Sequence, residues 1–99
     1  MSYRLSPLTL RRTPARLAIY QKLLADPSAT WTVADTAAEL TVNSSVETVR
    51  ATLYVLAEDG ILRARPHGQC LEFVLRSDGA ARLRWILNQW TNGAPAICA

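Results

Sequence analysis

Residues 41–62, TVNSSVETVRATLYVLAEDGIL, decide the fold of this chain. The first three of them predict a tight turn, after which Ser44 or Ser45 can cap a helix. That helix is expected to run to about Asp59, where Gly60 supplies the left-handed conformation that commonly ends a helix. A strand begins directly after the glycine. The segment therefore predicts a turn, a helix and the start of a strand, in that order.

The expected helix has two unlike faces. Its apolar residues recur at helical spacing and are predicted to point into a core: Val46, Val49, Leu53 and Leu56. Small or hydroxyl-bearing residues fall on the other face: Ser44, Thr48, Ala51 and Thr52. A surface helix usually carries long charged side chains there, so this slim face, with Arg50 at its flank, is shaped to enter a groove. The pattern points to DNA.

Upstream of this segment the sequence predicts two further helices. The first begins at Pro14, where a missing N–H does no harm, and it ends at Asp26, because a residue before proline is pushed out of the helical region. A short strand over residues 29–32 follows. Thr32 then caps a helix over residues 33–40.

Downstream, residues 61–66 and 69–75 predict two strands around a Pro-His-Gly turn, and residues 77–92 predict a last helix. The fold class is therefore α+β and mostly helical: a winged helix-turn-helix with a three-helix core, a wing sheet of two to three strands and an additional C-terminal helix. We divide the chain into a basic arm (1–13), the winged domain (14–76), a dimerisation helix (77–92) and a flexible tail (93–99).

Composition is consistent with a small DNA-binding protein. The formal net charge of +3 and the pI of about 9.3 suit a polyanionic partner, and Lys22 is the single lysine among the basic residues. Arginine makes bidentate contacts to phosphate and guanine. A GC-rich genome produces the same arginine bias, so composition alone does not establish the partner.

Cysteine usage and hydropathy exclude several other classes of protein. Cys70 and Cys98 are too few and too far apart for a disulfide scaffold or a paired metal motif, and Cys70 is expected to be a small buried residue in a strand. No apolar run approaches the roughly 18 residues that span a bilayer. Arginines interrupt the N-terminal segment where a secretory signal needs an apolar core. We expect a cytoplasmic, nucleoid-associated protein with no membrane contact.

The segment from Ser44 to Leu62 resembles the reading helix and wing entry of GntR-like bacterial winged-helix repressors. The matching residues are Thr48, Val49, Arg50, Leu53, Leu56, Asp59 and Gly60. MarR-, PadR- and ArsR-like regulators share the same layout. The resemblance implies that Ser45, Thr48 and Arg50 contact phosphates or base edges. Glu47 departs from the pattern, and its carboxylate would either accept a hydrogen bond from cytosine or repel phosphate.

The candidate DNA contacts come from the reading helix, the hairpin and the arm: Asn43, Ser44, Ser45, Glu47, Thr48, Arg50, Thr52, Arg63, Arg65, His67, Arg11 and Arg12. Each has a simpler interpretation. The hydroxyls at the helix start can act as caps alone, and Arg50 can pair with an acidic neighbour. The hairpin arginines can serve as edge-strand charges that deter unwanted pairing. The charge of the arm can be incidental.

The last helix carries more apolar surface than a domain of this size needs for its own core. We expect the surplus to form the interface of a two-fold homodimer, through Leu83, Trp85, Ile86, Leu87 and Trp90. The alternative is that leucines of the arm cover this surface.

No catalytic constellation is present in the sequence. His67 is the only histidine, and there is no carboxylate pair at a defined spacing and no phosphate-cradling glycine loop. We therefore expect no enzyme activity and no cofactor, and no small-molecule ligand is indicated. The predicted function is sequence-specific binding of double-stranded DNA by a small dimeric repressor. Two alternatives stay open: a winged-helix docking module within a larger assembly, or an accessory protein in plasmid or phage DNA maintenance.

Overall fold

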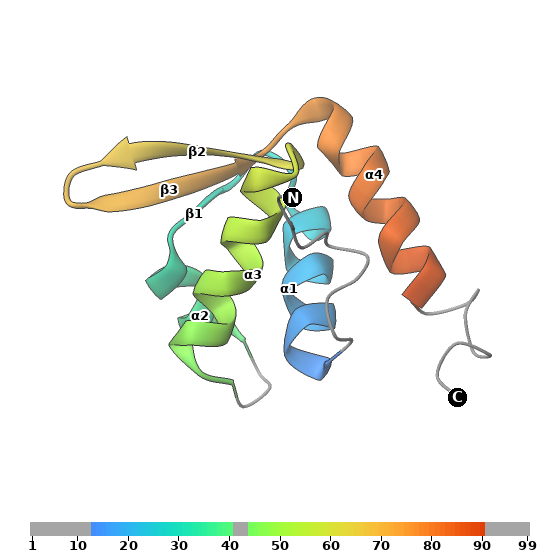
Figure 1. Ribbon diagram of the computed structural model, residues 1–99, viewed down its shortest axis with the longest axis horizontal. Coiled ribbons are helices and arrows are strands. Elements are labelled where there is room, and N and C mark those ends of the chain that lie inside the picture. Colours follow the sequence, from blue (N-terminus) through green and yellow to red (C-terminus); the bar gives the residue numbers. More distant parts are fainter. Residues whose placement is uncertain (1–12, 41–43, 91–99) are drawn as a thin grey trace, which may run out of the picture.

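A computed structural model describes residues 13–40 and 44–90 (Figure 1). Its helices are α1 (Pro14–Ala25), α2 (Val33–Glu39), α3 (Val46–Glu58) and α4 (Ser77–Asn88). Its strands are β1 (Thr30–Trp31), β2 (Leu62–His67) and β3 (Cys70–Leu75). The α+β winged helix-turn-helix arrangement expected from the sequence is confirmed.

The ends of the first two helices follow the capping rules that predicted them. Thr13 caps α1 by accepting a hydrogen bond from the Arg16 amide at 3.1 Å, and Pro14 occupies the first turn. Thr32 caps α2 by accepting from the Asp35 amide at 3.0 Å. These contacts satisfy N–H groups that have no partner within the helix.

Helix α3 also begins and ends as predicted. The Ser45 hydroxyl accepts a hydrogen bond from the Thr48 amide at 3.1 Å, and this bond fixes the first turn. At the other end, Gly60 has a φ of +83°, in the region where a side chain would be strained. The Ile61 amide donates back to the Leu56 carbonyl at 2.9 Å. The chain therefore leaves the helix directly into β2.

The sheet has three antiparallel strands in the order β1-β3-β2, so the hairpin of β2 and β3 pairs with the short β1 on one side. Leu62 lies opposite Leu75, and Ala64 lies opposite Phe73. This face of the hairpin is turned toward the core. Beyond the base of the hairpin the two strands project away from the helices as a thin ribbon (Figure 1).

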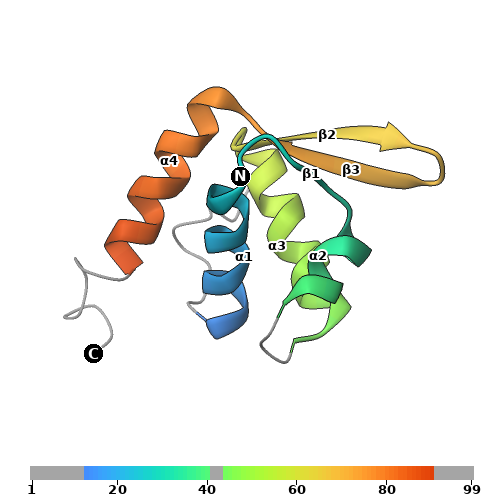
Figure 2. The same cartoon turned by 180° about the vertical axis from the view of Figure 1, so that it is seen from behind.

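The core lies where α1, α3, α4 and the base of the hairpin meet. Figure 2 shows α1 between α4 and α3, and α1 packs against both. Its central residues are fully enclosed: Ile19, Tyr20, Leu23, Val49, Leu53, Leu56, Ile61, Phe73 and Leu83. Apolar burial of this kind supplies most of the driving force for folding.

Two expectations about burial are wrong. Val46, predicted to point into the core, is 48% exposed, because it sits in the first turn of α3, to one side of the stripe formed by Val49, Leu53 and Leu56. Cys70, predicted to be buried, is exposed, because it lies at the outer end of the hairpin opposite His67, where none of the described helices covers the sheet.

Helix α4 is joined closely to the end of α3. A Cβ atom added to Gly79 would lie 2.2 Å from the Ile61 carbonyl oxygen, so only glycine permits this approach. The Arg76 amide donates to the same carbonyl at 3.0 Å. Arg82 forms an ion pair with Asp59 and donates to its backbone carbonyl at 2.8 Å. These contacts fix the direction in which α4 leaves the sheet.

Candidate nucleic-acid interface

Two hydroxyl groups lie side by side at the start of α3. The Ser45 and Thr48 oxygens are 3.0 Å apart, and the Ser45 oxygen also accepts from the Thr48 amide. Ser45 is exposed and Thr48 is half-buried. The start of a helix has free N–H groups and a partial positive charge, which favour a phosphate nearby. Because one of the two hydroxyls donates to the other, the pair keeps one O–H that can donate to an anion.

Glu47 and Arg50 form an ion pair one turn into α3. The Arg50 guanidinium donates to the Glu47 carboxylate at 2.5 Å, and the two side chains are 43% and 82% exposed. The hydrogen bond that Arg50 donates to Glu47, together with the negative charge of Glu47, raises the pKa of Arg50. Arg50 is therefore held by its neighbour, and a guanine or phosphate would have to compete with Glu47 for it.

Thr52 does not belong to the open face, and the prediction that it contacts DNA from there is wrong. Its side chain is fully buried. The Thr52 hydroxyl donates to the Thr48 carbonyl at 2.7 Å and accepts from Nε of Arg16 at 3.3 Å. A threonine that bonds the carbonyl four residues back satisfies its own hydroxyl and can be buried like valine.

The remainder of the outer face of α3 is bare but partly apolar. Ala51 is exposed, and Tyr54 is 47% exposed with its ring 5.8 Å from that of Phe73. Tyr54 lines an open groove of about 410 Å³ between α3 and the hairpin, together with Val55, Ala57, Glu58, Ala64, Leu71 and Phe73. Nothing in the described chain roofs this face, so a long partner can lie along it.

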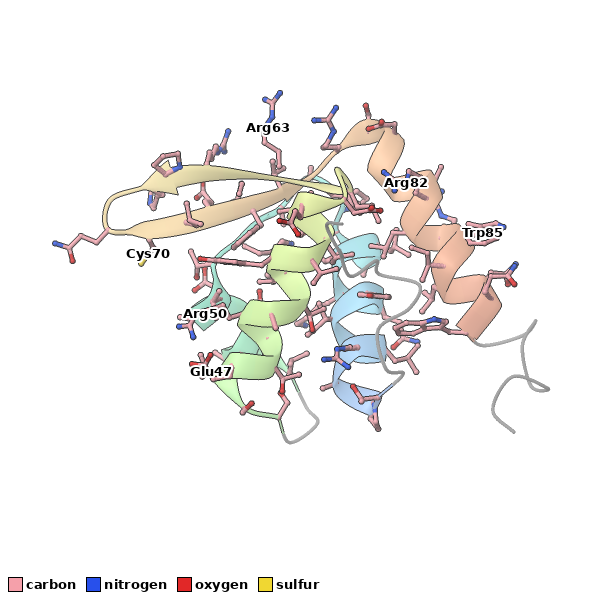
Figure 3. The ribbon with its side chains drawn as sticks, viewed as in Figure 1. Glu47, Arg50, Arg63, Cys70, Arg82 and Trp85 are labelled. Carbon is pink, nitrogen blue, oxygen red and sulfur yellow. The ribbon has the colours of Figure 1, made fainter. Side chains whose placement is uncertain are left out.

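The hairpin carries its basic residues on the opposite side. Arg63, Arg65 and His67 are exposed and alternate with Leu62, which is buried, and with Ala64, which lies on the same side of the strand as Leu62 but is exposed. Figure 3 shows Arg63 pointing away from α3. The structure therefore confirms that these side chains share a solvent-facing side of the hairpin, but it does not bring them together with Ser45 and Thr48.

Two of these wing residues have an acidic neighbour. Nε of Arg65 lies 3.0 Å from the Glu72 carboxylate on the adjacent strand, and Nδ1 of His67 lies 4.0 Å from it. Exposed pairs of this kind contribute little to stability. They do reduce the positive charge that the hairpin presents.

Three of the predicted DNA contacts lie outside the described residues: Asn43, Arg11 and Arg12. Ser44 lies within them, just before α3, and is half-buried.

The surface predicted for dimerisation is smaller than expected. Leu83 and Ile86 are buried in the core of the same chain, so the prediction that they form an interface is wrong. The Trp90 ring stacks on Tyr20 at 4.9 Å, and Leu87 packs partly against the core. A stripe of leucines does not reveal from sequence which partner covers it, and here α1 covers most of it.

Trp85 is the one predicted interface residue of α4 that is exposed. It is 55% exposed, and Figure 3 shows it pointing outward from the helix. It lines a shallow hollow with Ala81, Arg84, Leu87 and Asn88. The outward face of α4 is therefore a single aromatic residue with small and polar neighbours.

Sequence reasoning missed Tyr54 and Arg16. Tyr54 lies on the stripe that Glu47 and Ala51 begin, so helical spacing could have found it. Arg16 has no such signal, because its partner Thr52 is 36 residues away in the chain.

Solved structures with this fold include regulators. The crystal structure of a possible transcriptional regulator for arsenical resistance is 25% identical, with a TM-score of 0.60 over 95% of this chain and 94% of the other. A possible transcriptional regulator from Methanosarcina mazei Go1 is 19% identical, with a TM-score of 0.63 over 93% and 79%. Reduced HlyU from Vibrio cholerae N16961 is 21% identical, with a TM-score of 0.54 over 81% and 79%.

No protein-family model matches the chain, and neither does any curated protein sequence. The fold and its structural neighbours place the chain in the winged helix-turn-helix superfamily. None of the helices in the described ranges is long and apolar enough to cross a membrane.

Proposed function

We propose that the protein is a transcriptional regulator that binds double-stranded DNA through the first half of α3. The observation that carries this proposal is the open hydroxyl pair of Ser45 and Thr48 at the start of the second helix of a helix-turn-helix. In this motif the second helix enters the major groove and its first residues approach the bases. Ser45 and Thr48 would donate to phosphate or base edges, and Arg50 would exchange its bond to Glu47 for one to the duplex.

The wing would add backbone contacts from its outer half. Because the hairpin is a thin ribbon, a duplex that meets its end can be contacted from either face (Figure 1). Arg65 and His67 lie closest to the turn, whereas Arg63 lies near the base. Phosphate contacts of this kind fix the register of a protein on DNA without reading its sequence.

A two-fold dimer would join two such helices on a pseudo-palindromic site and so repress a promoter. Trp85 supports this part of the proposal, because an exposed tryptophan on a small domain commonly marks a contact. The predicted interface is narrowed from five residues of α4 to Trp85 and its immediate neighbours.

Selection of bound duplexes from a random pool tests the proposal directly. We expect an enriched sequence with two half-sites about one helical turn apart, because a dimer places its reading helices at that spacing. Binding to the selected duplex should weaken steeply with salt. Failure of the protein to retain any duplex at low salt would contradict the proposal.

The two hairpin arginines provide a second test. Replacing Arg63 and Arg65 together by alanine should lower affinity for all duplexes. The slope of log K against log salt concentration should become shallower by about 0.9 for each phosphate contact that is lost. Lys22→Ala is the control, since it removes one positive charge from α1, outside the hairpin and outside the neighbours of Trp85. An unchanged slope in the double variant would show that the wing does not touch the backbone.

A specific observation also supports docking of a protein partner. The outer face of α3 and the adjoining groove expose Val46, Tyr54 and Leu71, at 48%, 47% and 37%, while Glu47 neutralises Arg50. Such a surface is less suited to a phosphate backbone than a basic one. If the random pool yields nothing, this second candidate is favoured. If it yields DNA, footprinting separates a single operator from the extended array expected of a DNA-maintenance protein.

A further inference from the structure

A continuous chain of hydrogen bonds runs from α1 to the exposed hydroxyl pair of α3. Nε of Arg16 donates to the Thr52 hydroxyl at 3.3 Å, and that hydroxyl donates to the Thr48 carbonyl at 2.7 Å. The Thr48 amide in turn donates to the Ser45 oxygen at 3.1 Å. The part-buried bond between Arg16 and Thr52 is therefore linked through the backbone of Thr48 to the hydroxyl pair at the start of α3.

We infer that Arg16 and Thr52 are positioning residues that fix the register of Ser45 and Thr48 for reading a sequence. This inference rests on the proposed function and adds to it a specificity determinant that does not touch the duplex. Arg16 belongs to the first turn of α1, the helix that packs on both α3 and α4. Its bond to Thr52 ties the middle of α3 to that central helix.

The geometry argues for positioning rather than packing alone. Apolar contacts in the core fix how deeply α3 is buried, and a hydrogen bond adds a restraint on its rotation. A hydrogen bond is directional, since it weakens steeply as its angle closes. Thr52 is fully buried, so loss of its bond cannot be compensated by bulk water. A small rotation of α3 would move its open hydroxyls relative to the base edges.

The chain offers a matched control for this role. Thr36 of α2 is also buried, at 1% exposure, and its hydroxyl donates to the Thr32 carbonyl at 2.8 Å. The described structure shows no arginine bonded to it. Thr36→Val therefore removes the same kind of bond to a carbonyl four residues earlier as Thr52→Val, but it breaks no bond to an arginine of another helix.

The experiment measures discrimination, defined as the ratio of affinities for a duplex selected by the wild type and for a scrambled duplex. Thr52→Val should lower this ratio about three- to tenfold, the equivalent of one hydrogen bond. Affinity for the scrambled duplex and the salt slope should stay unchanged, because no phosphate contact is removed. Thr36→Val should discriminate like the wild type.

Two further variants separate positioning from packing. Thr52→Ser keeps the hydroxyl but removes a buried methyl, so a packing role predicts that it loses more than Thr52→Val, and our inference predicts that it keeps discrimination. Arg16→Lys keeps the charge but lacks the Nε–H, and it should resemble Thr52→Val, with no further loss in the double variant. Discrimination retained in Thr52→Val, or lost equally in Thr52→Ser, would overturn the inference.

Hydrogen exchange provides a readout that needs no DNA. Thr52→Val should speed exchange of the amides in the first turns of α3, while Thr36→Val should leave them unchanged. Unchanged exchange in Thr52→Val would overturn the positioning role. If the wild type binds no duplex, the proposed function fails, and this measurement still decides whether Arg16 and Thr52 hold α3.

Discussion

The two buried threonines of the described residues each donate their hydroxyl to a backbone carbonyl one helical turn earlier. Thr36 and Thr52 each donate to the residue four positions earlier, at 2.8 and 2.7 Å. A threonine in this arrangement behaves as an apolar residue toward its surroundings. This explains why Thr52 belongs to the inner stripe of α3 with Val49 and Leu53, although its hydroxyl suggested the outer face.

Tyr20 makes stability sensitive to alkaline pH. Burial raises the pKa of Tyr20 well above its ordinary value, and the nearby Arg16 charge opposes this only in part. The unfolded chain therefore releases the phenolic proton at about pH 10, while the folded chain keeps it. Its contribution to stability is complete below that pH and is lost as pH rises further.

We expect the free energy of unfolding to fall above about pH 10, and to fall less steeply in Tyr20→Phe. Urea unfolding curves recorded between pH 8 and 11, at intervals of about one pH unit, measure this free energy of unfolding directly. Tyr54→Phe is the control, because it removes a phenol that is 47% exposed. Equal pH dependence in the wild type and Tyr20→Phe would show that the buried phenol is not responsible.

Glu47 is expected to restrain binding to DNA of any sequence. Its carboxylate lies on the open face of α3 and holds Arg50, so Glu47→Gln should both remove a negative charge and release a guanidinium. Affinity for a scrambled duplex should rise several-fold at low salt, measured by fluorescence anisotropy. Glu39→Gln is the matched control, since the Glu39 carboxylate of α2 is also exposed and lies 3.2 Å from Nζ of Lys22 on α1. If Glu47→Gln does not raise the affinity for the scrambled duplex, the Glu47 side chain does not lie near the bound duplex.

Local signals determine where the helices begin and end. The caps at Thr13, Thr32 and Ser45 and the positive φ of Gly60 were all predictable, because each depends on residues within one turn. Which face is covered depends instead on contacts between distant segments. The burial of Leu83 and the link between Arg16 and Thr52 join different helices, and no local pattern reports them.

For the candidate site too, the sequence predicted local features but not contacts that depend on packing. The sequence located the open hydroxyls of Ser45 and Thr48 correctly, since helical spacing places them. It did not show that Arg50 is already paired with Glu47 or that Arg63 points away from α3. Rotamers and the twist of a hairpin follow from packing, so they cannot be read from residue spacing.

The joint between α4 and the sheet depends on Gly79. Gly79→Ala should destabilise the protein by about 1–3 kcal/mol or more, because the new Cβ overlaps the Ile61 carbonyl. Helix propensity alone predicts the opposite sign, a gain of about 1 kcal/mol. Ala81→Gly, at an exposed position of α4, measures that propensity separately. A thermal melt in which Gly79→Ala is more stable than the wild type would refute the close approach.

At the scale of the whole molecule, the two ends carry different surfaces. The hairpin and the open face of α3 lie on one side of α1, and the outward face of α4 lies on the other (Figure 2). A protein built this way can bind a partner with one end and a second copy with the other.

Self-association is expected to depend on Trp85. Sedimentation velocity should show a concentration-dependent dimer that Trp85→Ala weakens at least tenfold, since buried tryptophans are commonly hot spots. Tyr54→Ala is the matched control, because it removes an aromatic residue of similar exposure, 47% against 55%, from the opposite end. A monomer at every concentration, or equal weakening by both variants, would rule out this face as the interface.

The hairpin has a mechanical consequence. From Arg63 to His67 every residue of β2 is exposed, so the outer rungs of the ladder are held by backbone bonds with little apolar cover. We expect these rungs to open without unfolding of the core and to exchange their amide hydrogens sooner than α1 does. A hairpin that bends at a small cost in free energy can adapt to DNA grooves of different width. It loses conformational entropy, however, when binding immobilises it.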